Sequence, residues 1–187
     1  MNELAALPNL LTLARILLIL PVVGLLYLGE PWVRWIVLLL FLAASVTDWL
    51  DGRLARSRGL VSPFGRFLDP IADKLLVLSA LILLVNIDRL SALVALLIIA
   101  RELAVTGIRA IAAGEGMIIA AETTGKYKMA LQVIGITMLI LEDTGLAELG
   151  NLHLAGIATL YLSLIFGYVS GGQYVWSFWR QVVAKGL

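Results

Sequence analysis

Long apolar stretches limit what this chain can fold into more than any other feature of its sequence. Residues 36–44 contain no polar side chain, which excludes the alternating pattern of a transmembrane β-barrel. Of the 187 residues, 61% are hydrophobic and 14% are charged. A soluble domain usually has about a quarter of its residues charged. Part of the apolar surface is therefore expected to face lipid.

A helix needs about 20 mostly apolar residues to cross a bilayer, and stretches of this length predict an all-α membrane protein with about six transmembrane helices. No repeat or linker divides the chain, so residues 1–187 are predicted to form a single domain. The first span is expected to be retained rather than cleaved, because no basic residue precedes Arg15. The predicted spans cover about residues 8–29, 33–56, 67–87, 91–112, 124–142 and 151–178.

Composition removes several classes of function. The net charge of +1 gives no electrostatic sign of nucleic-acid binding. The absence of cysteine excludes disulfides, thiolate nucleophiles and cysteine metal sites. His153, the only histidine, is predicted at the outer face and is therefore not expected to act as a base or a metal ligand.

Basic residues gather in alternate connections between the predicted spans. Cytoplasmic loops of membrane proteins carry an excess of lysine and arginine. The basic connections and both termini are therefore predicted to be cytoplasmic, whereas the opposite connections hold only Arg34 and Arg89. The basic side chains concerned are Arg53, Arg56, Arg58, Arg66, Arg109, Lys126, Lys128, Arg180 and Lys185.

Two pairs of aspartates flank the connection between the second and third spans. Asp48 and Asp51 are three residues apart, and Asp69 and Asp73 are four apart. Each spacing places both carboxylates on one face of a helix. Because a short link makes the two helices antiparallel neighbours, the four carboxylates are predicted to converge at the cytoplasmic edge.

Such a cluster of negative charge needs cations near it. One reading is a structural network with the basic side chains Arg53, Arg56, Arg66 and Lys74. The other is a site for hard divalent ions, which prefer carboxylate oxygens. The lack of nearby histidine or cysteine favours magnesium or manganese over zinc. Two such ions would clamp a phosphoryl group between an attacking and a leaving oxygen.

The residues from Asp48 to Asp73 match the pattern D-x-x-D-G-x-x-A-R-x(8)-G-x-x-x-D-x-x-x-D at every fixed position. This pattern resembles the signature of the CDP-alcohol phosphotransferases. The resemblance implies six spans, a cytoplasmic active site, two bound Mg²⁺ or Mn²⁺ ions, an inner-membrane location and a homodimer. It also implies that all four aspartates are metal ligands and that Asp73 is the general base.

The same resemblance implies contacts with the lipid donor CDP-diacylglycerol. Glycines would let the backbone approach the pyrophosphate, and an arginine fork would bind its oxygens. Glycine in a membrane helix also allows close helix packing, and Ser62 before Pro63 is equally a simple turn residue. The residues predicted to bind CDP-diacylglycerol are Asn9, Thr12, Gly52, Arg56, Ser62 and Gly65.

The segments flanking the signature are similar to those of the bacterial phosphatidylglycerophosphate synthases, whose acceptor is glycerol 3-phosphate. Met129 departs from that family, which often has threonine there. A phosphorylated acceptor needs positive charge, and the residues predicted to bind its phosphate are Arg101, Arg109, Lys126 and Lys128. The alternative for the last three is ordinary positive-inside charge. Arg101 and Glu102 are expected to contact other helices rather than each other, because neighbouring helical residues point in different directions.

These observations predict a direct displacement in which an acceptor hydroxyl attacks the phosphorus attached to diacylglycerol and CMP leaves. The alternatives within the same chemistry are serine or an inositol phosphate as acceptor. An alternative of a different class is an ion-coupled transporter, which would use the intramembrane charges and predicts related halves. No repeat is visible in the sequence.

Overall fold

In a computed structural model, the described part of the chain is helical and contains no strand, which confirms the all-α prediction. The structure describes residues 30–58, 63–117, 123–142 and 150–185, together with residues 17, 21, 24, 25, 28 and 144. Within the helices, the side chains at 31, 47–58, 63–73, 123 and 185 lie outside this description. The helices are α2 (Pro31–Arg58), α3 (Pro63–Asn86), α4 (Ala92–Gly114), α5 (Thr123–Ile140) and α6 (Leu152–Lys185).

The five helices agree with five of the predicted spans, and the predicted span 8–29 lies mostly outside the described residues. The helices begin or end a few residues beyond the apolar stretches. Pro31 and Pro63 are the first residues of α2 and α3. Proline suits this position because its fixed φ fits the helix and its missing N–H would be unpaired there anyway. The helical backbone therefore starts before the apolar pattern does.

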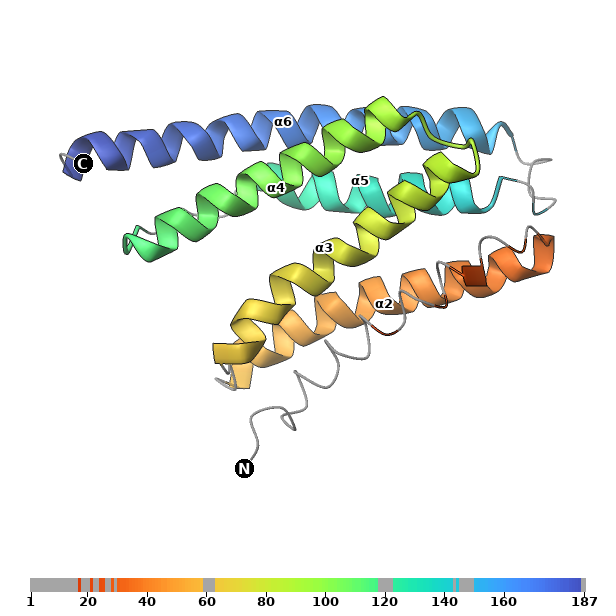
Figure 1. Ribbon diagram of the computed structural model, residues 1–187, viewed down its shortest axis with the longest axis horizontal. Coiled ribbons are helices and arrows are strands. Elements are labelled where there is room, and N and C mark those ends of the chain that lie inside the picture. Colours follow the sequence, from red (N-terminus) through yellow and green to blue (C-terminus); the bar gives the residue numbers. More distant parts are fainter. Residues whose placement is uncertain are drawn as a thin grey trace.

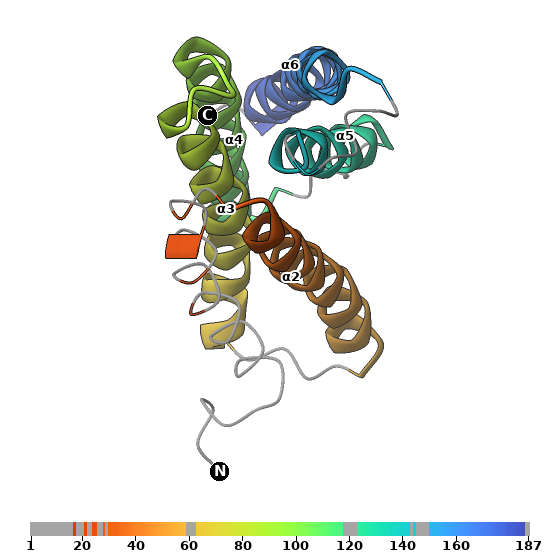
Figure 2. The same ribbon diagram turned by 90° about the vertical axis from the view of Figure 1, so that its right-hand side faces the viewer.

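Successive helices run in opposite directions (Figure 1). The C-terminal ends of α2, α4 and α6 and the N-terminal ends of α3 and α5 point to the same side of the molecule, the left of Figure 1. Figure 2 looks along the bundle from its other end and shows α5 beside α6, with α4 against α6 and α2 beside α3. The helix ends that carry the predicted site residues therefore share one side.

Among the described residues, only α6 contains a segment long and apolar enough to cross a membrane, Leu152–Ala184. Shorter apolar segments lie in α2 (Trp32–Val46) and α3 (Lys74–Asn86). Charged residues near the ends of α2 and α3 shorten their apolar segments. The 34 residues of α6 extend about 51 Å at 1.5 Å per residue, which exceeds the roughly 30 Å hydrocarbon thickness of a bilayer. The helix continues past the predicted end at residue 178.

Arg89, between α3 and α4, binds the C-terminal end of α5 on the side opposite the predicted site. Its side chain is buried and donates from Nη1 to the carbonyl oxygens of Leu139, at 2.7 Å, and Ile140, at 3.3 Å. Its Nε lies 3.8 Å from Glu142, whose carboxylate is also 3.0 Å from Nδ1 of His153. Arginine is a favourable partner for the last carbonyls of a helix. The only histidine thus belongs to a cluster remote from the aspartates.

Helices α5 and α6 approach each other closely at two glycines. A Cβ atom on Gly135 would lie 2.8 Å from Cγ of Leu160 and 3.1 Å from the carbonyl oxygen of Gly156. A Cβ atom on Gly156 would lie 2.9 Å from Cγ of Leu139. Small residues at such crossings let two membrane helices approach closely. This contact fixes α5 against α6 and thereby sets the position of the polar residues further along both helices.

Replacing either glycine with alanine is therefore expected to destabilise the protein. Overpacking of a tight core contact costs about 1–3 kcal/mol, which lowers the Tm of a protein of this size by at least about 2 °C. Thermal unfolding of purified Gly135→Ala and Gly156→Ala would measure the effect. Gly172→Ala is the matched control, because a Cβ there meets nothing within 4 Å. Equal Tm values for Gly135→Ala and the control would contradict this account of the contact.

Candidate active site

The two aspartate pairs occupy helix ends on the same side of the molecule. Asp48 and Asp51 lie in the C-terminal part of α2, and Asp69 and Asp73 lie in the N-terminal part of α3. Residues 59–62 connect the two helices, so the Cα atoms of residues 58 and 63 are at most about 19 Å apart. The backbone thus agrees with the predicted antiparallel arrangement (Figure 1). The aspartate side chains lie outside the described residues.

The chemistry of these four residues fits a hard divalent ion. Both pairs are in helices, so the spacings of three and four residues place each pair on one helical face. Carboxylate oxygens are the ligands that magnesium and manganese prefer. Among the side chains that the structure describes, no group of three or more histidine, aspartate or glutamate residues could hold a metal ion. The spacing and chemistry of the two aspartate pairs make them the candidate metal ligands.

The predicted donor-binding residues are described only in part. The backbones of Gly52 and Arg56 belong to α2, and that of Gly65 belongs to the first turn of α3. All three positions are on the same side of the molecule as the aspartates. The predicted contacts at Asn9, Thr12 and Ser62 lie outside the described residues.

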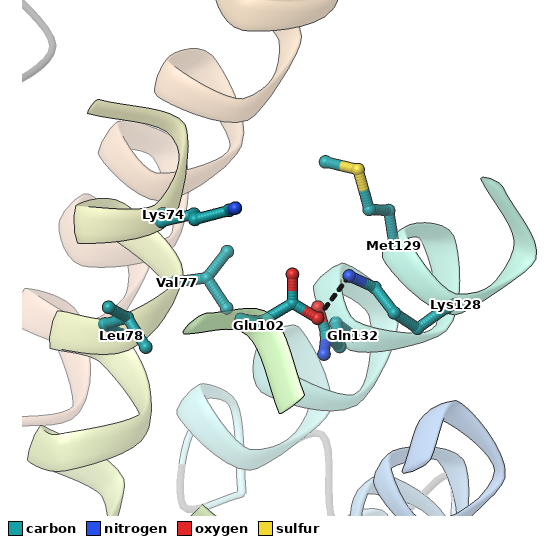
Figure 3. Close-up of a pocket in the computed structure, with 7 residues that line it drawn as sticks. All are labelled: Lys74, Val77, Leu78, Glu102, Lys128, Met129 and Gln132. Atoms are coloured by element: carbon teal, nitrogen blue, oxygen red, sulfur yellow. Dashed lines mark hydrogen bonds and ion pairs between the residues drawn. The ribbon is translucent and has the colours of Figure 1, made fainter. Parts of the chain in front are cut away.

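A pocket lies between α3, α4 and α5. One of its lining residues, Lys74, directly follows Asp73 in the sequence. Its polar lining residues are Lys74, Glu102, Lys128 and Gln132, and the apolar ones are Val77, Leu78 and Met129. Figure 3 shows the ammonium groups of the two lysines extending from α3 and α5 toward the space above the Glu102 carboxylate. Met129, the departure noted in the sequence, also lines this pocket.

Glu102 is the centre of a buried charge network. Its Oε1 accepts hydrogen bonds from Nζ of Lys128, at 2.6 Å, and from Nη1 of Arg101, at 2.8 Å. Nε of Arg101 donates to the carbonyl oxygen of Gly167 at 2.8 Å, and Nη2 donates to Oγ of Ser170 at 2.6 Å. The network therefore joins α4 to both α5 and α6.

The prediction that Arg101 and Glu102 do not contact each other is wrong. Their Cβ atoms point in different directions, but the long arginine side chain curves back so that its guanidinium reaches the neighbouring carboxylate. The accompanying prediction is confirmed, because each residue also has a partner on another helix, Lys128 for Glu102 and Ser170 for Arg101.

The four predicted acceptor-binding cations are in different environments. Lys128 is buried and, of the four, is the one that lines the described pocket. Arg101 is held by the network at α6. Arg109 is exposed, and Cζ of its guanidinium lies 4.6 Å from the ring centre of the buried Tyr174, within the range of a cation–π contact. Lys126 is exposed near the start of α5.

Several residues of the network, of the pocket and of the Arg109 contact were given no role in the sequence analysis. Gly167, Ser170 and Tyr174 lie on α6, and Gln132 lies one turn after Lys128 on α5. The four-residue spacing of Lys128 and Gln132 was a visible signal that they share a face. The α6 residues carried no such signal, because serine and glycine in an apolar helix commonly serve packing alone.

Comparison with known proteins identifies the family. The sequence profile of the CDP-alcohol phosphatidyltransferases matches residues 5–169. The chain is 42% identical to the CDP-diacylglycerol–glycerol-3-phosphate 3-phosphatidyltransferase of Bacillus subtilis (strain 168), over 93% of this chain and 95% of the relative. It is 38% identical to the enzyme of the same name from Rickettsia bellii (strain RML369-C), over 90% of this chain and 92% of the relative.

A relative with a different name is also similar. The chain is 36% identical to a CMP-forming cardiolipin synthase of Oryza sativa subsp. japonica, over 95% of this chain and 59% of the relative. The profile match covers most of the chain and includes both aspartate pairs, so this chain belongs to the CDP-alcohol phosphatidyltransferase family.

Proposed function

We propose that the chain transfers the phosphatidyl group from CDP-diacylglycerol to glycerol 3-phosphate, giving phosphatidylglycerophosphate and CMP. The observation that carries this proposal is the similarity to relatives named for that reaction over at least nine-tenths of the chain. The reaction belongs to phospholipid biosynthesis. Membership of a transferase family also removes the reason to treat the intramembrane charges as those of an ion-coupled transporter.

In this proposal the four aspartates Asp48, Asp51, Asp69 and Asp73 hold two Mg²⁺ or Mn²⁺ ions. When bound, these ions neutralise negative charge on the pyrophosphate of the donor. Asp73 removes the proton from the acceptor hydroxyl as its oxygen attacks the phosphorus. A new phosphorus–oxygen bond forms to glycerol 3-phosphate, and the bond to CMP breaks. A single displacement needs no covalent nucleophile in the protein.

The donor is proposed to lie along the ends of α2 and α3. Arg56 would bind phosphate oxygens through its fork of N–H groups. Gly52 and Gly65 leave room at the backbone for the CDP group. Asn9, Thr12 and Ser62 are also proposed to contact CDP-diacylglycerol, and they complete this site.

The acceptor phosphate is proposed to bind near the start of α5. Lys128 lines the pocket, and Lys126 and Arg109 lie at ends of α5 and α4 on the same side of the molecule. Charged donors attract a phosphate dianion from solution and hold it. Arg101 completes the proposed set of acceptor-binding cations. Three of its five N–H groups bind partners within the protein, so it also supports the acceptor site.

The chain is proposed to be one domain with six spans in the inner membrane, both termini and the active site being cytoplasmic. The basic helix ends share one side of the molecule (Figure 1). Trp32 at the start of α2 and Trp176 and Trp179 near the end of α6 are more than 60% exposed, as expected of rings at the two membrane surfaces. Large apolar side chains such as Leu39 and Leu96 are exposed on the helices between them. A homodimer is the proposed assembly, since two-fold pairing is the commonest.

A second candidate keeps the donor and changes the acceptor. The similarity to a CMP-forming cardiolipin synthase favours a phospholipid hydroxyl as the alternative acceptor. The buried lysine in the pocket favours a small phosphorylated acceptor over this alternative. It also disfavours serine, which carries no phosphate.

Measuring CMP release from CDP-diacylglycerol with a panel of acceptors tests the proposal. Glycerol 3-phosphate is expected to support release at least about 100-fold faster than serine, an inositol phosphate or phosphatidylglycerol, because serine lacks the phosphate and the other two hold it in a different geometry relative to the attacking hydroxyl. Faster release with phosphatidylglycerol or serine would reassign the acceptor. If none of the acceptors in the panel supported CMP release, the assigned reaction would be contradicted.

A further inference from the structure

Glu102 is an acidic residue next to a site that has to bind anions, and the proposed chemistry gives it no task. The residue is 9% exposed, and its carboxylate accepts hydrogen bonds from two cations through the same oxygen, Oε1. A buried charge of this kind is retained only when it is well paired, because burial removes its hydration. The pairing here brings together Arg101 from the same helix and Lys128 from α5.

Arg101 anchors this carboxylate to α6. Its Nε and Nη2 atoms bind the Gly167 carbonyl oxygen and the Ser170 hydroxyl, and its Nη1 binds Glu102. Gly167 makes room for the contact, because a Cβ there would already touch Nε of Arg101 and Cγ of Lys128 at 3.5 Å. Arg101 is thereby fixed on three sides, and Glu102 is fixed with it.

Glu102 in turn fixes Lys128 at the wall of the pocket. The lysine is 5% exposed and its Nζ lies 2.6 Å from the carboxylate. A lysine side chain is a flexible stem that carries a compact charge, so its position depends on such a partner. The ammonium has three donors and can bind Glu102 and a further oxygen atom at the same time.

The described charges around the pocket favour an anion. Lys74, Arg101 and Lys128 are positive and Glu102 is negative, so positive charge exceeds negative charge among these four residues. Without Arg101, the carboxylate would cancel half of the charge of the two pocket lysines. The arginine therefore allows a carboxylate to hold Lys128 without lowering the positive charge that the two pocket lysines supply.

We propose that Glu102 is a positioning residue for the acceptor: it holds Lys128 on the pocket wall and is itself held on α6 through Arg101. The inference rests on the proposed function, because it takes the acceptor to be a phosphate monoester. Glu102 acts through Lys128 and does not touch the reacting atoms. Its loss is therefore expected to weaken acceptor binding more than donor binding.

The test uses the full chain with saturating magnesium and compares Glu102→Gln, Glu102→Asp, Lys128→Met and the double variant. Glu102→Gln is expected to raise the KM for glycerol 3-phosphate about tenfold, the usual size of one lost charged hydrogen bond. The KM for CDP-diacylglycerol is expected to stay within about twofold of the wild-type value. Glu102→Asp should recover part of the loss. The double variant should be no worse than Lys128→Met, because the two residues act as one unit.

The matched control is Glu115→Gln, which removes an exposed carboxylate just beyond α4 and is expected to change neither KM. A lower KM for glycerol 3-phosphate in Glu102→Gln would mean that the carboxylate competes with the phosphate for Lys128, and would overturn the proposal. Equal effects on both substrates, or additive effects in the double variant, would also overturn it. If Glu102→Gln does not fold, equal effects of Lys128→Met on the KM values of both substrates would do so.

The failure of the proposed function would look different. In that case the wild-type protein would not prefer glycerol 3-phosphate in the acceptor panel. A wild-type preference for glycerol 3-phosphate with an unchanged acceptor KM in Glu102→Gln would refute the positioning role and leave the proposed function standing.

Discussion

Removal of divalent cations is expected to abolish CMP release completely, and added magnesium or manganese is expected to restore it. The four aspartates are proposed to hold these ions, and without them four carboxylates near a pyrophosphate would repel the donor. The measurement is CMP release by the purified protein in excess chelator, followed by titration with each metal ion.

The control for this experiment is the same concentration of chelator already saturated with magnesium, which should leave activity unchanged. Zinc is expected to restore less activity than magnesium or manganese, because the proposed ligands are all carboxylate oxygens. Full activity in excess chelator would contradict the two-metal site. The structural alternative, in which nearby basic side chains neutralise the aspartates, would then be favoured.

The replacement Asp73→Asn is expected to have the next largest effect. Asp73 lies one turn beyond Asp69 on α3 and next to the pocket residue Lys74. A general base contributes about 10²–10⁴-fold to turnover, and asparagine keeps the size of the side chain but is a far weaker base. The kcat should therefore fall by this factor while the affinity for CDP-diacylglycerol stays nearly intact.

The other aspartates provide the comparison that gives this result its meaning. Asp48→Asn and Asp69→Asn should weaken both donor binding and turnover, because these residues are proposed to act only as metal ligands. Asp88→Asn is the matched control: Asp88 follows α3 at its other end, with a φ of 57° that asparagine tolerates. Donor binding and kcat are measured on the same purified variants. Near-normal turnover in Asp73→Asn would place the base elsewhere, and loss of donor binding would make Asp73 chiefly a ligand.

Much of the fold could be predicted from the lengths of the apolar stretches. The positions of α2 to α6 follow from them because a long apolar stretch predicts a helix, in which the backbone N–H and C=O groups pair with one another. The ends of these helices were predicted less accurately than their positions. At α3 the helix begins at Pro63, four residues before the predicted start, and at α6 it continues to Lys185. Backbone hydrogen bonding does not stop where side chains become polar, so hydropathy alone does not mark these ends.

The candidate site was predictable where its residues are close in sequence. The spacings of Asp48, Asp51, Asp69 and Asp73 required only helical periodicity and one short link. The network around Glu102 was not predictable in this way. Its partners lie 26 residues away at Lys128 and, through Arg101, 69 residues away at Ser170. Which cation faces which carboxylate depends on how α4 packs against α5 and α6, and no local pattern records that packing.

The lipid product formed by the purified protein tests the central claim most directly. Wild-type protein supplied with CDP-diacylglycerol, labelled glycerol 3-phosphate and magnesium should form phosphatidylglycerophosphate and CMP in equal amounts. Asp48→Asn should form neither at a comparable rate. Absence of the labelled lipid in the wild type would contradict the assigned reaction, and wild-type rates in Asp48→Asn would show that the aspartate pairs of α2 and α3 do not carry it.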